Sequence, residues 1–192
     1  MWVIGGPNGA GKSTLVSRRA AARIPVVNPD DIAVALPRIA GRLDERQAGK
    51  IALRDRRELL AAGESFAIET TLTGHSALRF MQQAREADYK ITLVFVGLHS
   101  PSLSAQRVAD RVRQGGHSVP VSALLRRYPD AMARLPQAIS VVDRAFVLDN
   151  SSERRRLLLA TEDTRIRYLA RDLPAWFVSA CPEFGDHGTH DQ

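Results

Sequence analysis

Short aliphatic runs alternate with longer stretches of helical period along most of the chain. The runs with strand character cover residues 1–5, 24–27, 65–68, 91–98 and 145–148. Apolar residues recur with helical spacing over residues 12–22, 43–62, 76–87, 102–114 and 121–142, the last stretch being interrupted at Pro129 and Pro136. Strands and helices that alternate in this way predict an α/β fold, with a five-stranded parallel sheet flanked by helices.

The alternation stops after Asn150. Residues 156–160 and 165–170 flank the polar segment TEDT and predict a C-terminal β-hairpin, with a helix as the competing interpretation. Residues 181–192 carry Gly, Asp and His without any period, which predicts a flexible tail. No internal repeat or linker divides the chain, so we expect a single domain over residues 1–180.

The composition narrows the class of protein. The 192 residues are 44% hydrophobic and 25% charged, which is typical of a globular domain. The chain has no apolar run of about 18 residues, no signal-like start, and Cys181 as its single cysteine, so it is expected to be cytoplasmic and not bound to a membrane. The net charge of +6 is compatible with any anionic ligand, and the basic residues could equally be no more than a solvated surface. Only 6% of the residues are aromatic and they do not alternate with basic residues, which argues against nucleic-acid binding.

The segment GPNGAGKS, residues 6–13, matches the pattern G-x-x-x-x-G-K-[ST] and lies between the first predicted strand and the first predicted helix. Its glycines let backbone N–H groups converge on phosphate oxygens at the start of the helix. Lys12 is predicted to reach the β- and γ-phosphates of ATP, and Ser13 to bind Mg²⁺. The motif identifies the fold as a three-layer P-loop NTPase, with an expected strand order of 2-3-1-4-5. We expect ATP to contact Gly6, Pro7, Asn8, Gly9, Ala10, Gly11, Lys12, Ser13 and Thr14. Thr14 would contact the α-phosphate, with helix packing as its alternative role.

Among P-loop proteins the sequence favours a kinase over a transporter-type ATPase. It has no L-S-G-G signature and no strand of four apolar residues that ends in Asp-Glu. Asp30 instead follows the second predicted strand, at the sheet edge where ligands of α/β proteins bind. Asp30 is therefore the candidate general base, which would accept the proton of the attacking hydroxyl. The alternative is that Asp30 or Asp31 caps the next helix, a role that suits Asp31 better.

Polar residues also follow the third and fifth predicted strands. Glu69 lies beside the P-loop if the third strand neighbours the first, where it could hold Mg²⁺ through water or bind the acceptor. An ion pair with an arginine is the competing interpretation of Glu69. Thr70, Thr71 and Thr73 offer hydroxyl groups to either substrate. Asn150 is predicted to contact the adenine ring of ATP, although its neighbours would equally form an ordinary turn.

An arginine-bearing helix with a glycine pair after it predicts a lid over residues 101–128. Arg107 and Arg111 are four residues apart and share one helical face, where they could neutralise charge on the transferred phosphoryl group. The glycine pair at 115–116 would be the hinge. A basic face that is only solvated is the alternative. Two further lid residues are expected to bind the substrate, His117 and Arg127.

The combined order of these motifs resembles the zeta toxin family of P-loop kinases, in its short stand-alone branch, over about residues 1–150. The resemblance rests on the P-loop, the Asn28-x-Asp30 element, the Ile68-Glu69-Thr70 strand end, the arginine-bearing lid and Asp149-Asn150-Ser151. It implies phosphorylation of a sugar hydroxyl in UDP-N-acetylglucosamine by ATP, with Asp30 as the base and the lid arginines on phosphate. The lid segment GGHSVP departs from the spacing of the better-known toxins, which leaves the acceptor open. The resemblance also leaves open whether the chain is a toxin paired with an antitoxin protein.

The sequence thus predicts transfer of the γ-phosphoryl group of ATP to a hydroxyl of a small molecule, with Lys12, Asp30, Arg107 and Arg111 as catalytic residues. A polynucleotide or nucleoside kinase is the second interpretation, which predicts salt-sensitive binding to oligonucleotides. The third is a nucleotide-gated binding protein, in which ATP orders the arginine segment for a partner. Catalysis is favoured because two carboxylates at one phosphate site repel each other unless a metal ion offsets the repulsion.

Overall fold

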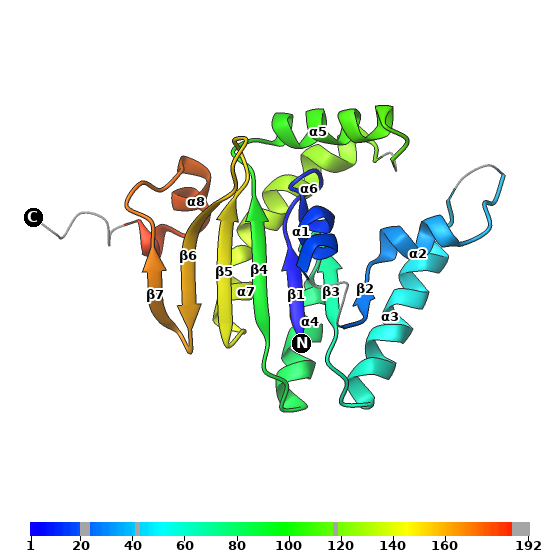
Figure 1. Cartoon of the computed structure of the whole chain (residues 1–192), viewed down its shortest axis with the longest axis horizontal. Coiled ribbons are helices and arrows are strands. Elements are labelled where there is room, and N and C mark those ends of the chain that lie inside the picture. The colour runs from blue at the N-terminus through cyan, green and yellow to red at the C-terminus, as the bar shows by residue number, and fades with distance from the viewer. Residues whose placement is uncertain (20–23, 41–42, 117–118, 186–192) are drawn as a thin grey trace, which may run out of the picture.

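A seven-stranded mixed sheet forms the centre of the molecule in the computed structural model, which describes residues 1–19, 24–40, 43–116 and 119–185 (Figure 1). The order of the strands is β2-β3-β1-β4-β5-β6-β7. The strands are β1 (Trp2–Gly5), β2 (Val26–Val27), β3 (Ala67–Thr70), β4 (Thr92–Gly97), β5 (Arg144–Asp149), β6 (Arg156–Glu162) and β7 (Arg165–Leu169). Strands β1 to β5 run parallel in the predicted order, so that part of the prediction is confirmed.

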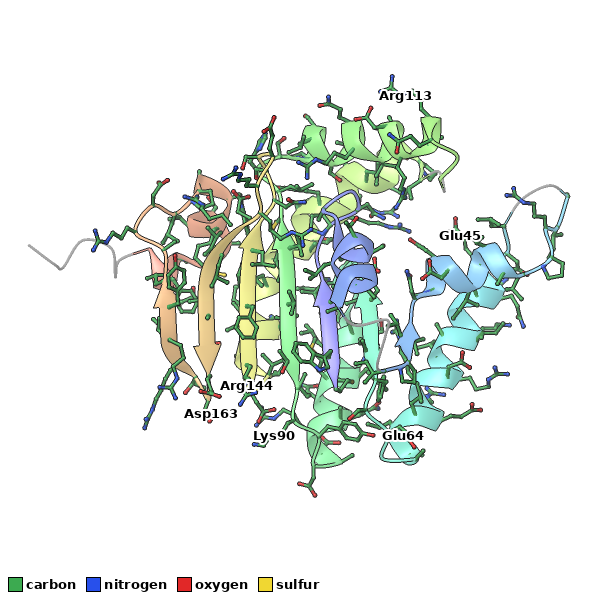
Figure 2. The ribbon with its side chains drawn as sticks, viewed as in Figure 1. Glu45, Glu64, Lys90, Arg113, Arg144 and Asp163 are labelled. Carbon is green, nitrogen blue, oxygen red and sulfur yellow. The ribbon has the colours of Figure 1, made fainter. Side chains whose placement is uncertain are left out.

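The predicted five-stranded parallel sheet is wrong in extent, because the C-terminal hairpin joins the sheet. Strand β6 pairs antiparallel with β5, and β7 pairs antiparallel with β6. Arg144 at the start of β5 bonds Glu162 across the pair, Nε to Oε1, at 2.8 Å. Arg144 lies at the same end of the sheet as Asp163, which is in the turn between β6 and β7 (Figure 2). The hairpin covers the open edge that β5 would otherwise present, which is a liability in a folded protein.

Helices follow the strands as the sequence predicts, with additional short ones. They are α1 (Lys12–Arg19), α2 (Pro29–Ala35), α3 (Glu45–Ala61), α4 (His75–Glu86), α5 (Pro101–Arg113), α6 (Val121–Ala133), α7 (Leu135–Ser140) and α8 (Ala175–Ala180). Helix α1 lies in front of the sheet, α4 and α7 lie behind it, and α5 lies across the carboxyl ends of the parallel strands (Figure 1). Across the described ranges, no helix is both long and apolar enough to cross a bilayer.

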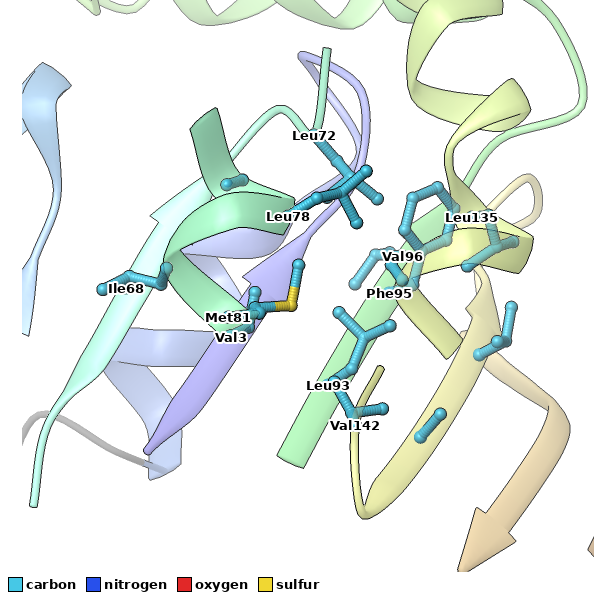
Figure 3. Packing of buried hydrophobic residues seen from close by; sticks show 14 of the residues in the cluster. Val3, Ile68, Leu72, Leu78, Met81, Leu93, Phe95, Val96, Leu135 and Val142 are labelled. Carbon is cyan, nitrogen blue, oxygen red and sulfur yellow. The ribbon is translucent and has the colours of Figure 1, made fainter. Parts of the chain in front are cut away.

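Side chains that alternate along the strands enter two separate cores. Val3, Leu93 and Phe95 join the large cluster that packs against α4 and α7 (Figure 3). Ile4 and Val94, the intervening residues, pack in a smaller cluster with Val16 of α1. Period-2 alternation along a strand sends neighbouring residues to opposite faces, so both faces of the central strands are covered as predicted.

Helix α6 continues through Pro129, contrary to the predicted interruption there. Leu124, Tyr128 and Met132 are buried at a spacing of four, and the Tyr128 hydroxyl donates to the carbonyl oxygen of Leu98. This packing outweighs the one helical hydrogen bond that proline removes. Pro136 falls in the first turn of α7, where a missing N–H costs nothing.

The predicted flexible tail begins too early. Residues 182–184 form a 3₁₀ helix, Cys181 before it is fully buried, and the Phe184 ring stacks on that of Phe177 with 6.1 Å between centroids. Burial of these apolar groups anchors the segment to α8. The remainder of the predicted tail, residues 186–192, lies outside the described residues.

Gly97, the last residue of β4, has the Trp176 ring against it. A Cβ at Gly97 would lie 2.2–2.7 Å from three ring carbons, and Trp176 Nε1 donates to Asp149 Oδ1 at 3.1 Å, which restrains the ring. We expect Gly97→Ala to lower the free energy of unfolding by about 1–3 kcal/mol, measured in urea. Gly49→Ala is the control, since a Cβ there meets no atom within 4 Å and helical alanine is favoured by about 0.5–1 kcal/mol. Equal losses from the two substitutions would contradict the packing argument.

Candidate functional site

A cavity of about 620 Å³ lies at the carboxyl ends of β1, β2 and β3. Its walls come from the P-loop, the start of α2, one face of α3, the segment after β3, and helices α5 and α6. Most of the predicted site residues therefore meet around one space. Those that line it are Asn8, Gly9, Gly11, Lys12, Ser13, Thr14, Asp30, Glu69, Thr70, Thr71, Thr73, Arg107, Arg111 and Arg127.

The P-loop conformation requires glycine at its first position. Gly6 has a φ of +136°, and a Cβ there would lie 2.2 Å from the carbonyl oxygen of Val96 on the neighbouring strand. The loop can therefore pass this close to β4 only if its first residue has no side chain. Gly6, Pro7 and Ala10 are buried in the loop itself, so they shape the cavity without lining it.

Lys12 is folded against its own loop. Its Nζ donates to the carbonyl oxygen of Pro7 at 2.9 Å and lies 4.0 Å from Glu69 Oε1. Burial lowers the pKa of Lys12, while the nearby Glu69 carboxylate opposes this shift. A cation held in a desolvated site interacts strongly with any anion that enters it, because few waters screen the charge.

Glu69 faces the P-loop, as predicted. The parallel register pairs Glu69 with Ile4 of β1, and Ser13 Oγ donates to Glu69 Oε1 at 3.0 Å and to Oε2 at 3.1 Å. Burial raises the pKa of Glu69, against the lowering effect of Lys12. The competing interpretation, an ion pair with an arginine, is wrong because the paired cation is Lys12.

Asn28 holds the start of α2 against Glu69. Its Oδ1 accepts a hydrogen bond from the Asp30 backbone N–H at 3.1 Å, so Asn28 is the helix cap and the alternative that Asp30 or Asp31 caps α2 is wrong. Asn28 Nδ2 donates to Asp31 Oδ2 at 3.0 Å and to Glu69 Oε2 at 3.3 Å. These contacts leave the exposed Asp30 on the cavity wall, in the first turn of α2.

Helix α5 rests directly on the P-loop. Ser104 Oγ donates to the carbonyl oxygen of Asn8 at 2.7 Å, and a Cβ on Gly9 would lie 2.8 Å from the backbone of Ser104. Arg107 and Arg111 of α5 line the cavity above the loop, which is where the sequence predicted a lid. Ser104, which anchors the helix, was not among the predicted residues because a lone serine in a helix carries no sequence signal.

The glycine pair has a visible structural role at the end of α5. Gly115 has a φ of +88°, and the N–H of Gly116 donates to the carbonyl oxygen of Arg111 at 2.9 Å. This is the pattern of a glycine-terminated helix, so the pair ends α5, and its action as a hinge stays a prediction. His117, predicted to bind the substrate, lies outside the described residues.

Asn150 braces the P-loop from the side. Its side-chain Nδ2 donates a hydrogen bond to the carbonyl oxygen of Ala10 at 2.9 Å. The backbone carbonyl oxygen of Asn150 accepts a hydrogen bond from Arg107 Nη1 at 2.6 Å. Arg155 Nη2 adds a bond to the carbonyl oxygen of Gly11 at 3.2 Å. Asn150 is not part of the cavity lining, so its predicted contact with adenine stays a prediction.

Arg56 of α3 is the main cavity residue that the prediction missed. Its side chain is buried, with 7% of the residue exposed, and its Nη2 donates to the carbonyl oxygen of Glu69 at 3.2 Å. Ala48, Ala52 and Arg56 are the buried residues of α3 and lie four apart. That spacing was the available signal, because it places Arg56 on the inward face of the helix.

A magnesium ion fits this donor set. Among the described residues, no three His, Cys, Asp or Glu side chains gather as an all-protein metal site. The Ser13 hydroxyl and the Glu69 carboxylate instead offer neighbouring oxygens beside the P-loop. Mg²⁺ in phosphate-transfer sites is bound by one or two such protein oxygens together with substrate phosphates and water.

Comparisons with known proteins agree with this fold. The sequence model of the AAA domain family matches residues 1–135. An uncharacterized protein of Haemophilus influenzae is 31% identical over 123 residues, which cover 64% of this chain and 88% of the relative.

Three solved structures share the fold at low sequence identity. A chain of the AvrRxo1-ORF1:-ORF2 complex with ATP has a TM-score of 0.71 at 14% identity, covering 86% of this chain and 59% of that one. A chain of the PezAT toxin–antitoxin system of Streptococcus pneumoniae has a TM-score of 0.57 at 16% identity, covering 95% and 76%. A putative kinase from Chloroflexus aurantiacus has a TM-score of 0.51 at 21% identity, covering 65% and 75%. The chain thus spans less than two thirds of the AvrRxo1 complex chain that it matches.

Proposed function

The chain belongs to the AAA domain family, and from this premise we propose that it is an ATP-dependent kinase that phosphorylates a hydroxyl group of a small molecule. One observation carries the proposal. The P-loop lysine, the Ser13–Glu69 pair and the carboxylate of Asp30 line one cavity, with Arg107 and Arg111 on its lid side. A binding protein would need the phosphate cradle, but it would have no use for a free carboxylate at the same site.

In the proposed reaction, the P-loop amides and Lys12 bind the β- and γ-phosphates of ATP. The acceptor hydroxyl oxygen forms a bond to the γ-phosphorus while the bond between that phosphorus and the β–γ bridging oxygen breaks. Asp30 accepts the hydroxyl proton, and ADP leaves with the bridging oxygen. Mg²⁺, held by Ser13 and Glu69, would neutralise charge on the phosphates.

The arginines of α5 are proposed to stabilise the transferred group. Arg107 is held by its bond to Asn150, and both Arg107 and Arg111 come from the helix that is anchored to the P-loop through Ser104. A positive charge positioned before the reaction stabilises the equatorial oxygens of the phosphoryl group without reorganisation cost. Arg127 lines the same cavity from α6 and is proposed to contact the acceptor.

The acceptor is proposed to be a nucleotide sugar of the UDP-N-acetylglucosamine type, and the chain to have an antitoxin partner. Both ideas come from the motif resemblance to zeta toxins. The fold shared with a chain of the PezAT toxin–antitoxin system supports only the second of them, the antitoxin partner.

The test is incubation of the protein with γ-labelled ATP, Mg²⁺ and either UDP-N-acetylglucosamine or a small-molecule extract. Label is expected in a small-molecule product, separated by chromatography. An oligonucleotide offered in parallel tests the polynucleotide kinase interpretation. Label found only in free phosphate, with every acceptor unlabelled, would contradict a kinase.

The Mg²⁺ concentration that phosphoryl transfer requires should depend on whether Glu69 is ionised. Because burial raises the pKa of Glu69, its carboxylate is protonated at a higher pH than that of a free glutamate. The half-saturating Mg²⁺ concentration for transfer is therefore expected to rise as the pH falls through this raised pKa. Glu69→Gln should need far more Mg²⁺ at neutral pH, and this pH dependence of the Mg²⁺ requirement should be absent from the variant. The same rise on acidification in both proteins would exclude Glu69 as the metal ligand.

A further inference from the structure

Arg56 is a buried cation whose hydrogen-bonding capacity is largely unused. A guanidinium has five N–H donors. Among the described residues, Arg56 donates one hydrogen bond, to the carbonyl oxygen of Glu69, and no carboxylate forms an ion pair with it. Its Nε is buried without a partner.

Such an arrangement is costly in the free protein. Removing an ion from water is compensated only when an opposite charge or a full set of hydrogen bonds replaces the solvent. Burial lowers the pKa of Arg56, and no neighbouring acidic group opposes the shift. A residue that serves only to tie α3 to β3 would not need a full positive charge, since a neutral amide could make the same bond to a carbonyl oxygen.

Arg56 reaches the cavity from α3, on another side than the P-loop. Glu69 directs its carboxylate toward Ser13 and the P-loop, whereas Arg56 approaches the backbone carbonyl of Glu69 from α3. Arg56 therefore lies on the α3 wall of the cavity, with Thr70 also in the lining.

The α3 wall also leaves room for a ligand. Gly49, Ala52, Leu53 and Arg56 line the cavity from this helix, and a Cβ on Gly49 would meet no atom within 4 Å. The small residues allow an extended molecule to lie along the helix. Glu45 marks the far end of this wall in Figure 2.

We propose that Arg56 is an acceptor-binding residue, which holds a phosphate group of the acceptor on the α3 side of the cavity. The inference rests on the proposed kinase function and adds to it the residue that makes the site selective for acceptors that carry phosphate. A neutral sugar or alcohol would leave the guanidinium without an anion. A phosphate pairs with it through charge-assisted hydrogen bonds, for which the planar fork of arginine is suited.

The experiment measures inorganic phosphate binding by calorimetry at constant ionic strength. The P-loop is first filled with Mg²⁺ and a non-transferable ATP analogue, so that phosphate cannot bind there. Native protein is compared with Arg56→Gln and with Arg57→Gln, which removes the same charge from the exposed neighbouring position of α3. We expect native protein and Arg57→Gln to bind equally, and Arg56→Gln to bind at least about tenfold more weakly.

Arg56→Lys distinguishes a loss of phosphate binding from a loss of folding. Lysine retains the charge but lacks the fork, so this variant is expected to keep the native melting temperature and to bind phosphate with intermediate affinity. Equal phosphate binding by Arg56→Gln and native protein, or no binding by native protein, would overturn the proposal. Failure of the kinase function itself would look different, since no acceptor would be labelled while the phosphate titrations remained as expected.

Discussion

Lys12→Met is expected to lower phosphoryl transfer by about 10²–10³-fold. The substitution preserves the length of the side chain but removes the one amine that lies within the P-loop, 2.9 Å from the carbonyl oxygen of Pro7 and 4.0 Å from Glu69. In this buried position no water can replace the lost charge against the β- and γ-phosphates. ATP affinity, measured by calorimetry, should fall together with transfer, because the lysine binds both the ground state and the transition state.

Lys90→Met is the charge-matched control for this experiment. Lys90 lies at the opposite end of the sheet, where its exposed Nζ pairs with Asp143 Oδ1 at 3.0 Å (Figure 2). Water screens an exposed pair of this kind, and Lys90 does not line the cavity, so transfer and ATP affinity should remain native. If Lys12→Met retained native transfer, the cavity would not be the site of the reaction.

Asp30→Asn is expected to reduce transfer by about 10²–10⁴-fold while ATP affinity stays within a small factor of the native value. The amide keeps the size and the helix position of Asp30 but cannot accept the hydroxyl proton. Since Asn28 is the cap of α2, the loss of the Asp30 charge should not unfold the helix. This pattern, with transfer lost and ATP retained, distinguishes a base from a residue that binds nucleotide.

Asp31→Asn is the matched control for Asp30→Asn. Asp31 is the next residue of α2, is also exposed, and accepts a hydrogen bond from Asn28 Nδ2 at 3.0 Å, but it does not line the cavity. Single-turnover transfer with γ-labelled ATP should therefore be near native in Asp31→Asn. Comparable losses in the two variants would assign the effect to the negative charge at the start of α2, and Asp30 would lose its role as base.

Much of the fold followed from local patterns. The alternation of aliphatic runs with helical stretches predicted five parallel strands. The P-loop motif predicted their order, and it identified the strand and helix that flank the candidate phosphate site. The antiparallel extension was not predicted, because the pairing partner of a hairpin depends on which sheet edge is exposed after folding. Pro129 was misjudged for the same kind of reason, since the packing of Tyr128 and Met132 that keeps α6 intact is tertiary.

By itself, the sequence determined the P-loop, Lys12, Ser13 and the two carboxylates at the carboxyl ends of β2 and β3. Each of these depends on spacing along the chain, and a glycine-rich turn between a strand and a helix dictates its own geometry. Only the tertiary structure decided which groups face them. The structure bonds Ser13 and Asn28 to Glu69, sets Ser104 on the loop and buries Arg56 in the α3 wall of the cavity. The partners in these contacts come from separate elements of the chain, so the contacts exist only after the sheet has ordered those elements and α3 and α5 have packed.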